Sequence, residues 1–113
     1  MKQNNLIFGK IIMVALNKPK FKLGKTVITP GALETLENSG QNPTTFLSRH
    51  IVADWGNICS EDIALNNDAI ANEGNIDKQM RVLSVYKTSK NDIIWIITEY
   101  DRSVTTILLP SEY

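Results

Sequence analysis

The chain has 113 residues, of which 42% are hydrophobic and 21% are charged, as is typical of one soluble globular domain. Twelve basic residues balance twelve acidic residues, so no net charge draws the protein towards nucleic acid or an anionic membrane. A single cysteine and a single histidine exclude an internal disulfide and a zinc site of ordinary composition. We therefore expect a cytoplasmic protein that has no cofactor and no bound metal.

Charge is unevenly distributed along the chain. Residues 1–25 carry six lysines and no acidic residue, whereas residues 26–80 carry eight acidic residues against Arg49 and Lys78. A basic arm of this kind can steer a phosphate ligand, but it is more often only a solvated tail.

The first residues contain an apolar run, LIFGKIIMVAL, that resembles the core of a signal peptide. Lys10 interrupts the run and no small-residue cleavage site follows, so we expect neither export nor a membrane partner. Residues 1–12 are either an edge strand or an extension upstream of a true start at Met13. Residues 13–113 are expected to form a single α+β domain.

Three helices are predicted next, because three segments each pair a helix-start signal with a stop signal. The segments read TPGALETLENSG, NPTTFLSRHIVADWG and SEDIALNNDAIANEG, and the first two have proline directly after the cap. The expected N-caps are Thr29, Asn42 and Ser60, and the expected stops are Gly40, Gly56 and Gly74.

The apolar period then changes to that of strands in MRVLSVYK, IIWIITEY and VTTILLP. The connections TSKND and DRS are too short for a parallel crossover, so these strands should form antiparallel hairpins. IIWII is apolar on both alternating faces, which predicts a central strand covered on both sides. We expect an α+β fold of about three N-terminal helices followed by a three- or four-stranded antiparallel β-meander.

The second predicted helix contains the only histidine. At 100° per residue, His50 and Asp54 both point towards its apolar side, one turn apart, while Arg49 points elsewhere. A carboxylate at this spacing can accept a hydrogen bond from the imidazole and so orient a general base. The alternative is a buried histidine satisfied by a neighbouring carboxylate or backbone carbonyl, which is the commoner case.

The densest polar cluster between apolar strands is TEYDRSVTT. Arg102 in its turn, Arg81 before the first strand, and the hydroxyls of Thr105 and Thr106 could bind a phosphate. The alternative is that the turn residues shape the turn and the threonines are ordinary strand formers.

The segments FKLGKTVITPGALETLENSG, FLSRHIVADWG and IIWIITEYDRSVTTILLPSEY resemble a family of small bacterial proteins carried on plasmids and other mobile elements. The resemblance runs from about Met13 to Tyr113 and implies no established activity. Many members carry glycine where this chain has Ala53.

A second resemblance concerns layout alone. Helices with an Arg-His pair, followed by an antiparallel sheet with a Thr-rich late strand, are similar to the barnase–EndoU–RelE-like ribonucleases, which generally need no metal. This resemblance implies His50 as general base or acid, with candidate phosphate-binding residues Arg49, Arg81, Arg102, Thr105 and Thr106. Fold does not fix function, so the implication is one of analogy.

Two functions are therefore expected. The first is a non-catalytic accessory protein of plasmid or mobile-element origin that binds a host or plasmid protein, or its own copy through the sheet face. The alternative is a metal-independent ribonuclease or toxin-like nuclease that uses His50 and binds RNA, although a net charge of zero counts against it. The exposure of His50 discriminates between the two.

Overall fold

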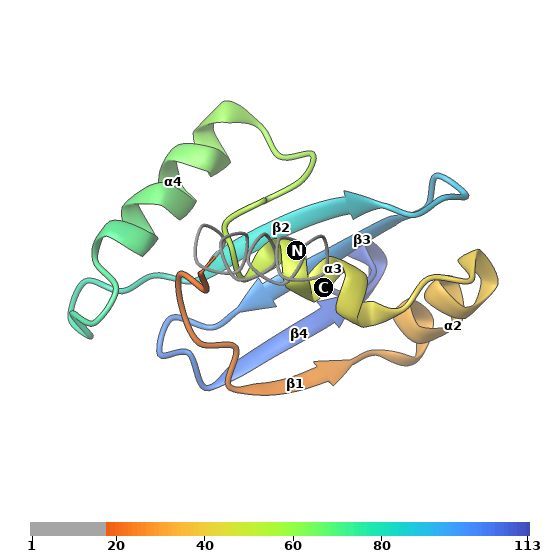
Figure 1. The fold of residues 1–113 in the computed structure, drawn as a ribbon, viewed down its shortest axis with the longest axis horizontal. Coiled ribbons are helices and arrows are strands. Elements are labelled where there is room, and N and C mark those ends of the chain that lie inside the picture. Colours follow the sequence, from red (N-terminus) through yellow and green to blue (C-terminus); the bar gives the residue numbers. More distant parts are fainter. Residues whose placement is uncertain (1–17) are drawn as a thin grey trace, which may run out of the picture.

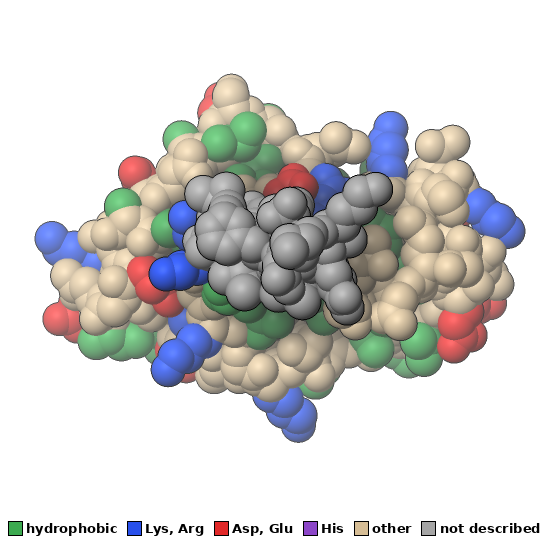
Figure 2. Space-filling model, viewed as in Figure 1, with side chains coloured by type: hydrophobic (Ala, Val, Ile, Leu, Met, Phe, Trp, Pro, Cys, Tyr) green, Lys and Arg blue, Asp and Glu red, His purple; other side chains and the backbone are tan. Residues whose placement is uncertain are grey.

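A computed structural model describes residues 18–113, so the expectations for residues 1–12 lie outside it (Figure 1). The fold is α+β, as predicted. Figure 2 shows the same view as a space-filling model, with side chains coloured by type. The elements in chain order are β1 (Lys25–Ile28), α2 (Pro30–Ser39), α3 (Pro43–His50), α4 (Ser60–Ala71), β2 (Val82–Lys87), β3 (Ile93–Thr98), β4 (Val104–Leu108) and the short 3₁₀ helix η1 (Pro110–Glu112).

The predicted caps set the starts of two helices. The Thr29 side chain accepts a hydrogen bond from the backbone N–H of Ala32 at 3.2 Å, and the Asn42 side chain accepts one from Thr44 at 2.9 Å. Helix α2 ends, as predicted, at Gly40, whose φ is 69°. Helix α4 is capped one residue earlier than expected, by Cys59, and it ends at Ala71 rather than near Gly74.

Helix α3 is shorter than the sequence predicts, because it ends at His50 and not near Gly56. Ala53 adopts a left-handed φ of 67°. The N–H of Ala53 donates to the carbonyl of His50 at 3.1 Å, and the N–H of Asp54 donates to that of Arg49 at 2.9 Å. This pair of bonds is a Schellman motif, and the left-handed residue within it stops the helix.

The sheet is mixed rather than purely antiparallel. Strands β2, β3 and β4 form the predicted antiparallel meander, and β3 is central. The order is β1-β4-β3-β2, with β1 parallel to β4 and Lys25 opposite Val104. The three helices lie between these strands in the chain and supply the long crossover that a parallel pair needs. The expectation that all helices precede the sheet is therefore wrong.

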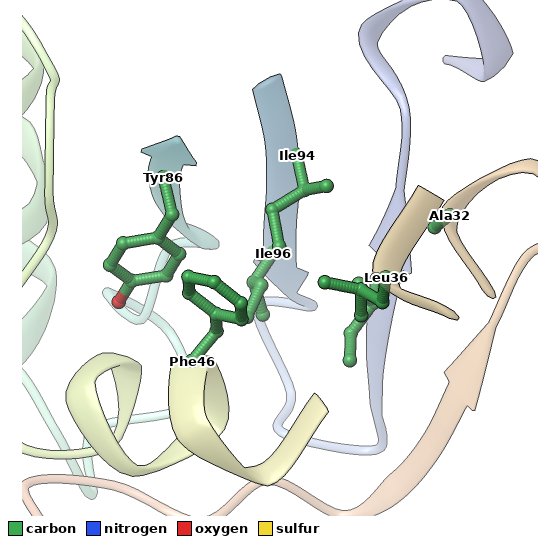
Figure 3. Close-up of a cluster of buried hydrophobic side chains, with 7 residues drawn as sticks. Ala32, Leu36, Phe46, Tyr86, Ile94 and Ile96 are labelled. Atoms are coloured by element: carbon green, nitrogen blue, oxygen red, sulfur yellow. The ribbon is translucent and has the colours of Figure 1, made fainter. Parts of the chain in front are cut away.

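The main core lies between the sheet and helices α2 and α3, on what we call the inner face of the sheet (Figure 3). Leu36 from α2 and Phe46 from α3 pack towards the middle of the sheet, and each is at most 2% exposed. The other buried members of this cluster are Ala32, Tyr86, Ile94, Ile96 and Ile107. Alternate residues of the same strands point to the opposite face of the sheet.

The two edge strands of the sheet, β2 and β1, differ in how far their outward backbone groups are hydrogen-bonded. Helix α4 runs beside β2 (Figure 1), and the Asn66 amide bonds both main-chain groups of Leu83, at 2.7 and 3.1 Å. Val85 donates to the carbonyl of Trp55 at 3.0 Å and accepts from the N–H of Asn57 at 2.7 Å. The outward backbone groups of Leu83 and Val85 on β2 are thus paired, and the other edge of the sheet is β1.

Candidate functional site

His50 occupies the last position of α3 and is fully buried beneath the inner face of the sheet, with an exposure of 0%. The rings of Phe21 and Trp55 lie edge-on to the imidazole, with centroids 5.1 and 5.8 Å away. No face of the ring is left for a substrate. By the criterion of exposure, His50 has the environment of a core residue.

Both imidazole nitrogens are hydrogen-bonded to hydroxyl groups on neighbouring strands. Nδ1 lies 2.6 Å from Ser84 Oγ on β2, and Nε2 lies 2.9 Å from Thr98 Oγ1 on β3. Thr98 Oγ1 is in turn 2.7 Å from Thr105 Oγ1 on β4, which donates to the carbonyl of Leu23 at 2.6 Å. The result is one buried chain of bonds that crosses three strands.

The far end of this chain fixes the tautomer of His50. The carbonyl of Leu23 can only accept, so the single hydroxyl proton of Thr105 is used there. Thr98 must then donate to Thr105, and its oxygen accepts from His50 Nε2–H. Nδ1 consequently carries no proton and accepts from the hydroxyl of Ser84. A neutral imidazole satisfies every member of the chain.

The surroundings hold His50 in that neutral form. Burial, followed by the positive charge of Arg102, lowers the pKa of His50 from 6.5 to about 3. A second proton, on Nδ1, would also face the Ser84 hydroxyl, which would have to accept a hydrogen bond there instead of donating one. A general base that exchanges protons near neutral pH needs a pKa close to that pH, and His50 does not meet this requirement.

Asp54 does not orient His50, so this part of the prediction is wrong. Its carboxylate pairs instead with Arg49, whose Nε and Nη2 donate to it at 2.7 and 3.2 Å. The early end of α3 turns Asp54 away from the imidazole and towards this guanidinium. The hydrogen bond between them lowers the pKa of Asp54 and raises the pKa of Arg49. Both side chains are about half exposed.

Arg102 is 8% exposed and serves the structure of the β3–β4 turn. Its Nε and Nη2 donate to the carboxylate of Glu73 at 3.0 and 2.8 Å, and its Nη1 donates to the carbonyls of Met80 and Glu99 at 2.8 and 2.9 Å. These acceptors use four of the five N–H donors of the guanidinium. Arg102 therefore joins the segment after α4 to the β3–β4 turn, and its hydrogen-bonding capacity is largely used within the chain.

Of the remaining phosphate candidates, Thr105 is linked to His50 and the other two are separated from it. Thr105 lies in the buried chain described above, whereas Arg81 and Thr106 line a hollow of about 280 Å³ on the opposite face of the sheet. Arg81 hydrogen-bonds the hydroxyl of Tyr113, and its guanidinium lies 5.5 Å from the centroid of that ring. The structure thus brings together Arg81 and Thr106, but it brings neither to the histidine.

The surface that contains this hollow is the second candidate site, and we call it the outer face. Tyr113 lies edge-on to Trp95 with ring centroids 5.6 Å apart, so the last residue and η1 cover one end of it. Ile93, at the start of β3, remains 41% exposed. The residues that point to the outer face, by strand register, are Leu83, Val85, Lys87, Ile93, Trp95, Ile97, Val104, Thr106 and Leu108, with Lys25 and Val27 at the margin.

Sequence reasoning identified Thr105 but missed the partners of His50. Ser84 alternates with Val82 and Tyr86, and Thr98 continues the inward side of Ile94 and Ile96. Polar residues at inward positions of adjacent strands need a buried partner, and the only histidine was available to supply it.

No family model, curated protein or solved structure matches this chain. Residues 18–113 contain no group of three or more potential metal ligands. In that same part of the chain, no helix combines the length and the apolar character needed to cross a membrane.

Proposed function

We propose that this protein acts without catalysis, by binding another protein through the outer face of its sheet. The observation that carries the proposal is the apolar outer side of the central strand β3. Helices α2 and α3 pack on the inner face, while the described residues cover the outer face only in part, through η1 and Tyr113. An apolar sheet face that its own chain covers only in part is typical of an interaction site.

The residue types on the outer face support the proposal. Trp95 lies near its centre, with Tyr113 against it and Arg81 over the tyrosine ring. Tryptophan, tyrosine and arginine are the residues that most often dominate binding energy at protein interfaces. The adjoining hollow offers room for a side chain of the partner, and its lining joins the apolar Ile97 and Leu108 to the carboxylates Glu99 and Glu112.

The ribonuclease alternative receives no support from the geometry. It requires His50 to reach RNA, whereas the imidazole is fully buried and neutral. It also requires free cations beside the histidine, whereas Arg49 and Arg102 are both paired with carboxylates. The proposed origin on a plasmid or mobile element rests on sequence resemblance alone.

Site-specific photo-crosslinking in living cells tests the proposal. A photoreactive amino acid is placed at Ile93 on the outer face or at Leu33 on helix α2, two positions that are both 41% exposed. We expect a discrete adduct with one protein from Ile93 and none from Leu33. That protein, identified by mass spectrometry and purified, should bind the wild-type chain and lose at least tenfold in affinity to Trp95→Ala.

Three outcomes would contradict the proposal. Equal adducts from both positions would mean that the outer face is not selective, and no adduct from either would mean that it is not an interface. An adduct of twice the chain's mass would assign the face to a homodimer instead of a second protein.

A further inference from the structure

Strand β1 presents an open backbone edge. The N–H of Lys25 donates to the carbonyl of Ser103, and the N–H of Thr29 donates to that of Ile107, both at 2.9 Å. The odd-numbered residues of β1 therefore direct their backbone N–H and C=O groups towards β4. In a parallel ladder the alternate residues face away, which directs the N–H and C=O groups of Thr26 and Ile28 outwards. The three residues from Lys25 to Val27 are exposed, and Figure 1 shows β1 as the border strand of the sheet.

The contrast with β2 makes this edge notable. On β2, the outward groups of Leu83 and Val85 are all bonded, by the Asn66 side chain and by the main chain of residues 55–57. On β1, neither Thr26 nor Ile28 has a comparable partner among residues 18–113. An unpaired edge strand is a template for another extended chain.

The positive charge around β1 indicates the charge of a partner that could bind there. Lys25 on β1 is exposed, as are Lys20 and Lys22 in the segment that leads into it, and no acidic residue occurs in residues 18–33. Lys or Arg side chains project from the same border in Figure 2.

Asp101 and Glu112 also lie close to the chain around β1, and both keep their negative charge while hydrogen bonds hold them in place. Asp101 accepts hydrogen bonds from Ser103, and Glu112 accepts bonds from Thr29 and the N–H of Gly31. The exposed lysines Lys22 and Lys25 favour an acidic partner at the edge itself.

We propose that the β1 edge binds an extended, acidic segment of a partner protein by strand addition. The added strand pairs with Thr26 and Ile28, while its carboxylates meet Lys22 and Lys25. Self-pairing of β1 with a second copy would bring the lysines of both copies together and is therefore disfavoured. The inference concerns the edge and not the outer face, so it stands or falls separately from the proposed function.

The test uses a model peptide, because the chemistry rather than the sequence of the partner is specified. The probe is a blocked octapeptide of alternating glutamate and valine, titrated into the ¹⁵N-labelled full chain at low salt. We expect saturable shifts of the Thr26 and Ile28 amide signals. The same peptide with alternate backbone nitrogens methylated keeps its charge but lacks donors, and it should bind at least fivefold more weakly.

A pair of variants probes the protein side of the contact. Thr26→Pro removes one outward N–H without touching a bond to β4, whereas Thr26→Ala keeps that N–H. We expect roughly fivefold weaker binding for the proline variant and little change for the alanine variant.

Several results would overturn the inference. Equal binding of the methylated peptide would mean that charge alone attracts the probe. Equal binding of a lysine–valine peptide would remove the role of the lysines, and shifts confined to the outer face would move the contact away from β1. If Thr26→Pro does not fold, the methylated peptide still decides the question.

Discussion

The Nδ1 atom of His50 lies 2.6 Å from the hydroxyl of Ser84, a residue 34 positions further along the chain on a different element. This bond ties the end of α3 to strand β2 inside the core, and on the other side of the ring the bond to Thr98 ties it to β3. His50 thus connects the end of α3 to two strands of the sheet through buried hydrogen bonds.

Replacing Ser84 by alanine should leave the unprotonated Nδ1 of His50 buried without a partner. We expect the free energy of unfolding to fall by about 1–3 kcal/mol, the cost of an unsatisfied buried polar group. Urea denaturation measures it. Ser48→Ala, at an exposed helix position, is the matched control and should change the free energy by less than about 0.5 kcal/mol. Equal effects of the two substitutions would contradict the assignment.

The pH dependence of stability should follow the low pKa of His50. Above pH 6.5 the imidazole is neutral in the folded and unfolded chains alike, so its contribution is fully present. As the pH falls from 6.5 towards 3, His50 is protonated in the unfolded chain but stays neutral in the folded chain. The free energy of unfolding therefore falls by up to about 1.4 kcal/mol per pH unit. Urea denaturation between pH 8 and 5 measures this slope.

The variant His50→Gln provides the control for that pH series, because it has no imidazole to titrate. Its stability should be nearly flat between pH 6.5 and 5, a range above the titration of Asp54, whose lowered pKa acts only at more acidic pH. A wild-type curve as flat as that of the variant would mean that His50 takes up its proton equally in both states.

The left-handed Ala53 offers a stabilising substitution. Its φ of 67° costs an L-residue energy that glycine does not bear, and its partly buried methyl packs against the cluster around Trp55. We expect Ala53→Gly to raise the free energy of unfolding by about 0.5–1 kcal/mol after the loss of that methyl contact. Thermal and urea denaturation check the change.

The matched control for Ala53→Gly is Ala64→Gly, at an exposed position inside α4. There glycine should lower stability by about 1 kcal/mol, because a helix interior gains nothing from a permissive backbone. Two changes of the same sign would show that the left-handed backbone at Ala53 carries no strain.

The ion pair between Arg49 and Asp54 should contribute little to stability. Both side chains are about half exposed, so Asp54→Asn is expected to lower the free energy of unfolding by less than about 1 kcal/mol at neutral pH. The NMR signals of the His50 ring should stay unchanged, because Asp54 makes no bond to it. A change of tautomer at His50 in this variant would restore the predicted dyad.

The sequence predicted the elements better than their arrangement. Two of the three helix caps, the β2–β3–β4 meander and the central place of β3 follow from local signals. Strand β1 was missed because KTVI is only four residues long, and its parallel partner β4 lies far along the chain. The early end of α3 was missed because alanine, rather than glycine, holds the left-handed position.

The site was harder to predict than the fold because its partners are distant in sequence. The i, i+4 spacing of His50 and Asp54 assumed a helix that continues to residue 54, whereas α3 stops at His50 itself. The true partners, Ser84 and Thr98, lie on strands 34 and 48 residues away. Only the inward register of these two polar residues pointed to a buried polar chain.

The most direct test of this account is a long-range ¹H–¹⁵N NMR spectrum of His50 recorded from pH 8 to pH 5. The account predicts one protonated nitrogen, Nε2, and one unprotonated nitrogen, Nδ1, with no titration over that range. A ring that titrates near pH 6.5, or one protonated at Nδ1, would contradict it. Such a result would return His50 to the candidates for catalysis.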